Sequence, residues 1–223
     1  MVNFQLKYKM EEKLMTSIFL THAHLGHYPG LLFLGKEAMN THNIPVMAGK
    51  EMKKLLENQA PWKQLTENKN IIIEEIINNQ SIKVTKKLKV IPIGVPHRNE
   101  FSETFGFWIK GAQKTVLYIP DIDSWHEWKY DIYEMAKKAD ICLLDGTFYS
   151  EKDLKDIARD PSEIPHPLMT ETMNRLEELT KQTDIYFIHL NHSNPALNEK
   201  KKNREKIEEK GLYVAEEGME FII

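Results

Sequence analysis

The stretch Phe19-Leu20-Thr21-His22-Ala23-His24-Leu25-Gly26-His27-Tyr28-Pro29-Gly30 places three histidines directly after the apolar run at residues 17–20. The run is short and β-prone, and Gly and Pro follow it, which predicts a buried strand that ends in a loop. His22 and His24 are two positions apart, so in extended backbone they point to the same side. We expect His27, on the turn into the next element, to reach the same point. Neutral imidazoles that converge on one point bind transition metals, and the stretch therefore predicts a metal site.

The composition excludes several other classes of protein. The chain has 223 residues and a formal net charge of −3, with lysine and glutamate mixed throughout, unlike the one-sided basic patch of a nucleic-acid binder. No long apolar segment opens the chain, which predicts neither a signal peptide nor a membrane span. The only cysteine, Cys142, lies in an apolar run and is expected to be buried without a disulfide. We expect a soluble, cytoplasmic protein with a small-molecule substrate and no nucleic-acid or membrane partner.

The rest of the chain predicts one domain of mixed α/β type over residues 1–223. Helical periodicity is present over residues 1–16, 31–39, 51–58, 125–139, 168–183 and 195–210. Strands are expected over residues 45–48, 71–73, 82–84, 88–93, 104–109, 115–119, 140–144, 184–188, 212–215 and 219–223. Ala60-Pro61-Trp62 breaks the helix at 51–58, and residues 149–168 are expected to be a long irregular segment. Trp125, Trp128, Ile132 and Met135 share one helical face and are expected to pack in the core.

Several predicted strands end at a residue that can bind a metal or act as a base. These residues are His97 after strand 88–93, Asp121 after 115–119, Asp145 after 140–144, and His189 and His192 after 184–188. If the strands belong to one sheet and end at the same edge, these side chains meet in a single cleft. A histidine-rich set with one aspartate suits zinc, or less selectively manganese or iron, and allows two ions bridged by the carboxylate. The sequence contains no G-x-S-x-G elbow, glycine-rich phosphate loop or reactive cysteine motif.

The motifs resemble those of a known superfamily. Thr21-His22-Ala23-His24-Leu25-Gly26-His27, Val95-Pro96-His97, Ile119-Pro120-Asp121 and Ile188-His189 occur in the order typical of the metallo-β-lactamase superfamily. The phrases at residues 143–148 (Leu-Leu-Asp-Gly-Thr-Phe) and 189–195 (His-Leu-Asn-His-Ser-Asn-Pro) look like its branch typified by the pyrroloquinoline quinone biosynthesis protein B. The resemblance implies an αββα sandwich of two mixed β-sheets flanked by helices, with the metal site at one edge.

The resemblance also implies roles for individual residues. His22, His24 and His97 match the first metal position, Asp121 matches the bridging carboxylate, and His27 and His189 match the second position. Asp145 matches an acidic position that orients a ligand histidine. His192 has no standard counterpart and is expected to be an outer-sphere group or a substitute ligand. The expected catalytic residues are Asp121, Asp145 and His192, and the expected cofactor is one or two divalent ions, with zinc preferred over manganese or iron.

Three features depart from the superfamily pattern. Gly26 replaces an aspartate that ordinarily binds the second ion, so one ion, a weak second ion or another arrangement all remain open. Leu144 stands where the phosphodiesterase members have a proton-shuttling histidine, which argues against simple transfer-RNA-processing chemistry. The histidine motif is reached by residue 22, so the usual opening strands are expected to be absent. The sheet edge left in this way would favour a homodimer.

Three functions follow from these observations as alternatives. The first is a metal-dependent hydrolase that uses metal-bound hydroxide on a small ester, lactam or phosphodiester-type substrate. The second, from the branch resemblance, is a metal-dependent oxidative step in the biosynthesis of a quinone cofactor, which would prefer iron or copper. The third is a non-catalytic metal-binding relic or carrier.

Two polar residues near these motifs are predicted to be structural. His166 lies between two prolines in Ile164-Pro165-His166-Pro167, which favours a rigid structural loop; the alternative is that this loop covers the cleft and His166 contacts substrate. Asp123 precedes Ser124-Trp125 and is expected to act in a turn or as a helix cap, with a spare metal ligand as the alternative.

Overall fold

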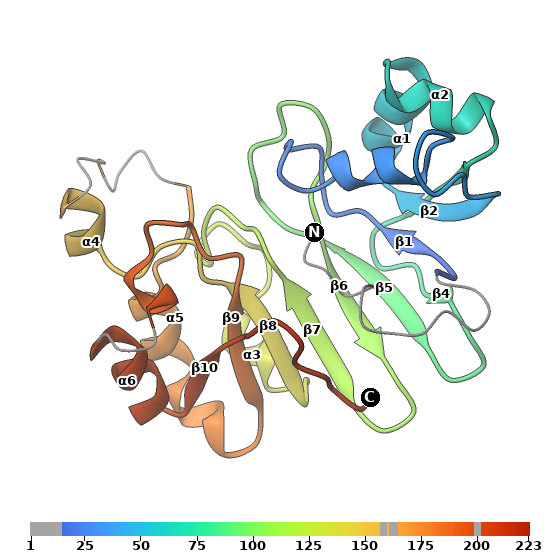
Figure 1. Cartoon of the computed structure of the whole chain (residues 1–223). Coiled ribbons are helices and arrows are strands. Elements are labelled where there is room, and N and C mark those ends of the chain that lie inside the picture. Colours follow the sequence, from blue (N-terminus) through green and yellow to red (C-terminus); the bar gives the residue numbers. More distant parts are fainter. Residues whose placement is uncertain (1–14, 157–159, 161–164, 199–201) are drawn as a thin grey trace.

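The computed structural model describes residues 15–156, 160, 165–198 and 202–223, which form two β-sheets flanked by helices (Figure 1). The smaller sheet contains β1 (Ile18–Phe19), β2 (Ile44–Ala48) and β3 (Ile71–Glu75), in that order and all parallel. The short helices η1 (Pro29–Leu34), α1 (Lys50–Asn58) and α2 (Trp62–Glu67) accompany it. Val46 of β2 packs with Leu56 of α1 and Trp62 of α2 in one buried cluster, which attaches these helices to the sheet.

The larger sheet has the strand order β10-β9-β8-β7-β6-β5-β4. Its strands are β4 (Ile82–Lys83), β5 (Lys89–Gly94), β6 (Phe105–Lys110), β7 (Thr115–Ile119), β8 (Ile141–Asp145), β9 (Asp184–Ile188) and β10 (Leu212–Val214). Neighbouring strands from β4 to β7 are antiparallel, whereas those from β7 to β10 are parallel. A parallel strand covered on both faces is apolar along its length. This explains the run Ile141-Cys142-Leu143-Leu144 in β8, in which Cys142 is buried as expected.

Helices cover the parallel half of the larger sheet (Figure 1). They are α3 (Ile132–Ala136), α5 (Met169–Leu176), η3 (Glu177–Lys181), η4 (Pro195–Leu197) and α6 (Lys202–Glu209), while α4 (Glu151–Asp156) lies away from the sheet. Leu117 of β7 and Phe187 of β9 share a buried cluster with Met173 of α5 and Ile207 of α6. Each fully buried aliphatic side chain of this kind stabilises the fold by roughly 1.5–3 kcal/mol.

Aromatic and aliphatic side chains join the two sheets. Met47 of β2 shares a buried cluster with Phe105 and Phe107 of β6. Phe19 of β1 meets Phe107 edge-on, with ring centroids 5.7 Å apart. The two sheets therefore pack face to face, and the expected αββα sandwich is confirmed.

Two predicted helices are much shorter than the periodicity indicated. The segment predicted as a buried helix over 31–39 is the 3-10 helix η1, which starts at Pro29 and leaves Leu32 and Phe33 exposed. Of the helix predicted over 125–139, only α3 is helical, and Asp131 caps it by accepting the Glu134 N–H. Trp125 and Trp128 are nevertheless buried, as expected, because the Trp125 indole donates to Thr172 Oγ1 and the Trp128 indole to the Gly94 carbonyl.

Other boundaries also differ from the prediction. The break predicted at 60–62 is followed at once by α2, the irregular segment at 149–168 contains α4, and residues 219–223 form no strand. The helices predicted over 168–183 and 195–210 are each divided, into α5 and η3 and into η4 and α6. The predicted helix at 1–16 lies almost wholly outside the described residues. Across the described part of the chain, every helix is too short or too polar to cross a bilayer.

We predict that Leu117→Ala lowers the free energy of unfolding by about 2–5 kcal/mol, because it leaves a cavity at a fully buried position of β7. Ile77→Ala, at a position that is 57% exposed, should change it by less than about 0.5 kcal/mol. Urea denaturation followed by tryptophan fluorescence measures both. Equal losses in the two variants would contradict the placement of β7 in the core.

Candidate metal centre

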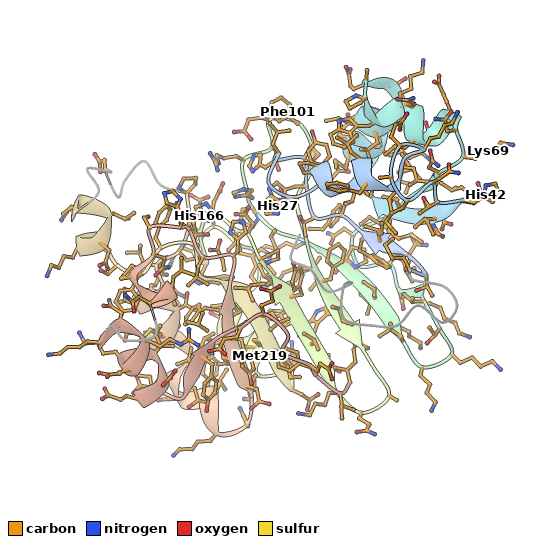
Figure 2. All side chains as sticks on the ribbon, in the orientation of Figure 1. His27, His42, Lys69, Phe101, His166 and Met219 are labelled. Atoms are coloured by element: carbon orange, nitrogen blue, oxygen red, sulfur yellow. The ribbon has the colours of Figure 1, made fainter. Side chains whose placement is uncertain are left out.

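The predicted metal ligands gather where strands end at one edge of the sandwich. β5 and β7 run in the same direction because each is antiparallel to β6, and β8 and β9 are parallel to β7. Their carboxyl ends therefore share one edge, where they deliver His97, Asp121, Asp145 and His189. β1 of the smaller sheet leads into the loop that carries His22, His24 and His27. Figure 2 labels His27 and His166 at this edge.

The first group consists of His22, His24, His97 and Asp121. His24 Nδ1 lies 2.9 Å from His22 Nε2 and 3.1 Å from His97 Nε2. Asp121 Oδ2 lies 3.3 Å from His22 Nε2, and Asp121 Oδ1 lies 3.2 Å from His97 Nε2. Three imidazole nitrogens and a carboxylate thus converge in the way that a tetrahedral zinc site requires.

The second group shares Asp121 and adds His27 and His189. His27 Nε2 lies 3.3 Å and His189 Nε2 3.7 Å from Asp121 Oδ2, and the two Nε2 atoms are 3.2 Å apart. The structure therefore brings together all six predicted metal ligands, with Asp121 between two sets of histidines.

Asp121 provides a test of whether these residues fit a metal. Its carboxylate is 3% exposed, and Oδ1 is a buried oxygen without a hydrogen-bond partner. Burial by itself would raise the pKa of Asp121, but the surrounding imidazoles hold that pKa far below its ordinary value. The group is therefore an ionised carboxylate whose free lone pairs face histidines. This donor set fits a divalent transition metal.

The histidines differ in their electrostatics. Burial lowers the pKa of His22 to about 4, so this imidazole is neutral near pH 7 and able to donate a lone pair. Burial also opposes the charged form of His97, but the carboxylates of Asp121 and Asp123 outweigh it and raise the pKa of His97. Because a bound ion must displace any proton from His97, metal affinity is expected to fall in acid.

Each histidine of the first group has a partner on its other ring nitrogen. His22 Nδ1 lies 3.1 Å from Thr21 Oγ1, His24 Nε2 lies 3.1 Å from Glu100, and His97 Nδ1 lies 2.6 Å from Asp123. The prediction that Asp123 acts in a turn or cap missed this contact, which joins two loops that are 26 residues apart in sequence. His97 and Asp123 meet because β5 and β7, which precede their loops, end at the same edge of the sheet.

Asp145 is a fully buried carboxylate that accepts four hydrogen bonds. Its donors are the backbone N–H groups of Ile122 and Thr147, the Thr147 hydroxyl and His166 Nδ1. Thr147 Oγ1 also lies 2.9 Å from His189 Nδ1. Since the hydroxyl proton goes to the carboxylate, His189 Nδ1 must donate to Thr147, which leaves the His189 Nε2 lone pair for the centre. Asp145 thus orients His189 through Thr147, and its own oxygens are already satisfied.

His166 belongs to the centre, which the prediction of a rigid structural loop missed. Its Nδ1 lies 2.8 Å from Asp145 Oδ2 and 3.4 Å from Asp121 Oδ1. Two prolines beside a histidine signal a rigid backbone, and this rigidity is compatible with holding a functional side chain. The signal in sequence was a loop of functional length that follows a ligand-bearing strand.

Other predicted residues lie outside the cluster. His192 is exposed and belongs to none of the ligand groups found among the described residues. Leu144, at the position of the shuttling histidine, is fully buried in the core. A side chain at Gly26 would find open space, because an added Cβ would have no atom within 4 Å.

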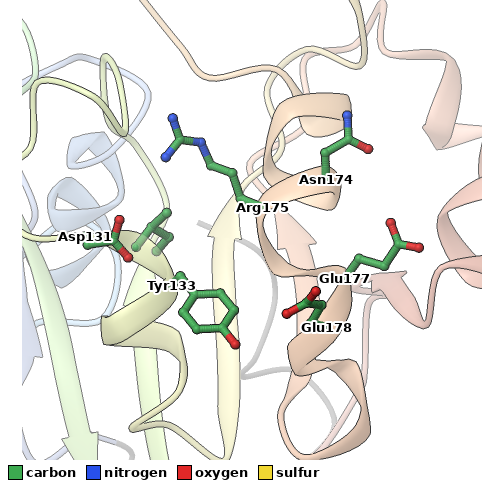
Figure 3. Close-up of a pocket in the computed structure, with 7 residues that line it drawn as sticks. Asp131, Tyr133, Asn174, Arg175, Glu177 and Glu178 are labelled. Atoms are coloured by element: carbon green, nitrogen blue, oxygen red, sulfur yellow. The ribbon is translucent and has the colours of Figure 1, made fainter.

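A separate hollow of about 570 Å³ lies between α3 and α5 (Figure 3). Its lining includes Asp131, Tyr133, Asn174, Arg175 and Glu177, and no histidine or cysteine. Arg175 is paired with Glu171 outside the hollow, and Glu177 with Lys210. The hollow therefore offers no imidazole or thiolate donor, and the transition-metal chemistry belongs to the histidine cluster.

Comparison with known proteins agrees with this geometry. Residues 6–190 match the family described as the beta-lactamase superfamily domain. Over 138 residues the chain is 29% identical to the coenzyme PQQ synthesis protein B of Nitrosococcus oceani, a match that covers 57% of this chain and 43% of the relative. The chain thus spans less than half the length of this curated relative.

Solved structures share the fold at low sequence identity. Zinc-bound PqqB from Methylobacterium extorquens superposes with a TM-score of 0.77 and 21% identity, covering 92% of this chain and 72% of that one. An isothiocyanate hydrolase from Delia radicum gut bacteria gives a TM-score of 0.62 and 14% identity, with 92% and 76% coverage. Both likenesses concern the sandwich itself.

We predict that His22→Ala lowers the zinc content of protein dialysed against trace zinc by at least about 10-fold, because it removes a buried neutral ligand of the first group. His126→Ala is the matched control, because His126 is exposed and contacts Arg175 and Glu171 outside the centre. Elemental mass spectrometry measures zinc per chain. Retention of full zinc content by His22→Ala would refute the first group as a binding site.

Proposed function

The chain belongs to the β-lactamase superfamily, and from this membership we propose that it is a metal-dependent hydrolase of a small ester, lactam or phosphodiester-type substrate. The observation that carries the proposal is the ionised Asp121 carboxylate, buried between two sets of histidines with an oxygen that lacks a donor. Structural metal sites are closed by protein ligands, whereas catalytic sites keep an open position, and His27 and His189 lie at an accessible edge. The accessible side supports a reaction with an entering substrate.

The nitrogen-rich donor set favours zinc, with manganese and iron as weaker fits. When bound, such an ion polarises a substrate oxygen and lowers the pKa of a water molecule towards neutrality. His22, His24 and His97 would hold one ion and His27 and His189 another, with Asp121 between them. The zinc-bound state of PqqB from Methylobacterium extorquens, which shares the fold, supports this choice.

His166 is the residue best placed to move a proton. A carboxylate only accepts hydrogen bonds, so the contact with Asp145 requires the proton to be on His166 Nδ1. In the neutral imidazole Nε2 then carries the lone pair and can accept a proton from water or return it to a leaving group. Asp145 acts by holding this tautomer, as the aspartate of a catalytic triad does. His166 would thus take the role of the proton-shuttling histidine that the phosphodiesterase members have at the position of Leu144.

A second function is favoured by one observation, the match to coenzyme PQQ synthesis protein B. It is a metal-dependent oxidative step in the biosynthesis of a quinone cofactor. Histidine and carboxylate ligands with open positions also suit iron, which supports redox chemistry that zinc cannot perform. Metal identity therefore separates the two proposals.

We predict that His166→Ala lowers kcat/KM by about 10²–10⁴-fold while zinc content stays unchanged, since His166 Nδ1 is held by Asp145 and the change removes the proposed proton carrier but leaves His22, His24, His27, His97 and His189 in place. p-Nitrophenyl acetate, nitrocefin and bis(p-nitrophenyl) phosphate are assayed with protein purified without added metal and then loaded with zinc. His42→Ala serves as the control, because His42 is exposed and its side chain contacts the neighbouring Asn43, away from the centre.

Three results would count against the hydrolase. Loss of zinc in His166→Ala would make His166 a ligand instead of a proton carrier. Full activity in that variant would remove it from the reaction. Iron or copper in the protein as purified, with no turnover of the three substrates by the zinc form, would favour the oxidative function.

A further inference from the structure

Asp121 belongs to all three groups of candidate ligands, the third of which joins it to Asp145 and His166. The first two groups, which hold the remaining histidines, are built differently. We propose that the two metal positions have unequal affinities, and that Asp123 and Glu100 set the difference by holding His97 and His24 of the tighter, first position. Neither residue belongs to a ligand group. The inference rests on the metal binding of the proposed function and is independent of the hydrolysis.

Asp123 is the stronger of the two positioning contacts. It lies 2.6 Å from Nδ1 of His97, whose side chain is fully buried. Because the carboxylate can only accept, Nδ1 carries the proton and the Nε2 lone pair faces Asp121 Oδ1 and His24 Nδ1. The imidazole is thereby held in the tautomer that a metal requires, and the nearby negative charge increases its basicity.

Glu100 does the same for His24 through the opposite ring nitrogen. Its carboxylate lies 3.1 Å from His24 Nε2, which leaves the lone pair on Nδ1, the atom that faces His22 and His97. Glu100 is about half exposed, so water screens this contact and its effect should be smaller than that of Asp123.

The second position has weaker support. His27 and His189 have side chains that are 18% and 29% exposed, whereas in the first group His22 and His97 are 1% and 0% exposed and His24 is 22% exposed. His189 is held by the neutral hydroxyl of Thr147, not by a carboxylate. The neighbour of His27 in the ligand loop is Gly26, which has no side chain to donate. The first position is therefore the preorganised one.

Loss of an outer-sphere partner of a metal ligand typically weakens metal binding by about 10–100-fold. Metal-free protein is titrated with zinc in competition with a chromophoric chelator, which resolves the affinities of successive equivalents. We expect a tight and a weaker equivalent in the natural protein. Asp123→Ala should weaken the tight equivalent by about 10–100-fold, Glu100→Ala by less, and Asp123→Asn should lie between Asp123→Ala and the natural protein because its amide oxygen still accepts.

Two further variants make the pattern specific. Thr147→Val should weaken only the second equivalent, because it removes the hydroxyl that orients His189 and keeps the side-chain volume. Glu127→Ala removes an exposed carboxylate close to Asp123 in sequence and should change neither equivalent. Thermal unfolding of each metal-free variant checks that the fold persists.

The results separate this inference from the proposed function. A single measurable equivalent that Asp123→Ala weakens supports the inference, since the second is then too weak to detect. Two equal equivalents, or a tight equivalent that Asp123→Ala leaves unchanged, would overturn it. No zinc binding at all would overturn both proposals. Unequal binding with the expected variant pattern, but no turnover of any ester, lactam or phosphodiester, would leave this inference intact and remove the hydrolase.

Discussion

The centre depends on one buried negative charge. The Asp121 carboxylate is 3% exposed and lies within 3.7 Å of His22, His27, His97, His166 and His189. An ionised carboxylate out of water is costly unless it is paired or binds a cation, and neutral imidazoles compensate it only in part. The pKa of Asp121 is held below its ordinary value, so its carboxylate stays ionised. This negative charge attracts a cation to the space between the two sets of histidines.

The sandwich keeps this arrangement in register. Parallel pairing of β7, β8 and β9 aligns the ends of these three strands. β5 ends at the same edge because β5 and β7 are both antiparallel to β6 and therefore run in the same direction. Packing of Phe19 on Phe107 fixes the smaller sheet, and with it the histidine loop, against the larger one. Ligands from both sheets are thus placed by rigid elements, while the groups that tune them lie in the connecting loops.

The histidines of the centre differ in how far their side chains are exposed to solvent. His22 and His97 are buried and have a hydroxyl and a carboxylate partner, whereas His24, His27 and His189 are partly exposed. A buried, preorganised position suits a resident ion, and an accessible one suits exchange of water or substrate. His166 lies beside both Asp121 and Asp145, so the proposed proton carrier and the candidate ligands lie in one polar network.

Strand periodicity in the sequence predicted a mixed α/β domain whose strands end at His97, Asp121 and His189, because strand ends are local properties. The sandwich and the set of six candidate ligands came from the resemblance of the motifs to those of the superfamily. Tertiary structure alone decided the roles of Asp123 and His166. Their partners are 26 and 21 residues away, and no local pattern records such contacts. The same reason accounts for the shortened helix near Trp125, where hydrogen bonding of the buried indole to Thr172 outweighed helical periodicity. Local sequence sets the path of each element, but the contacts between elements set which side chains meet.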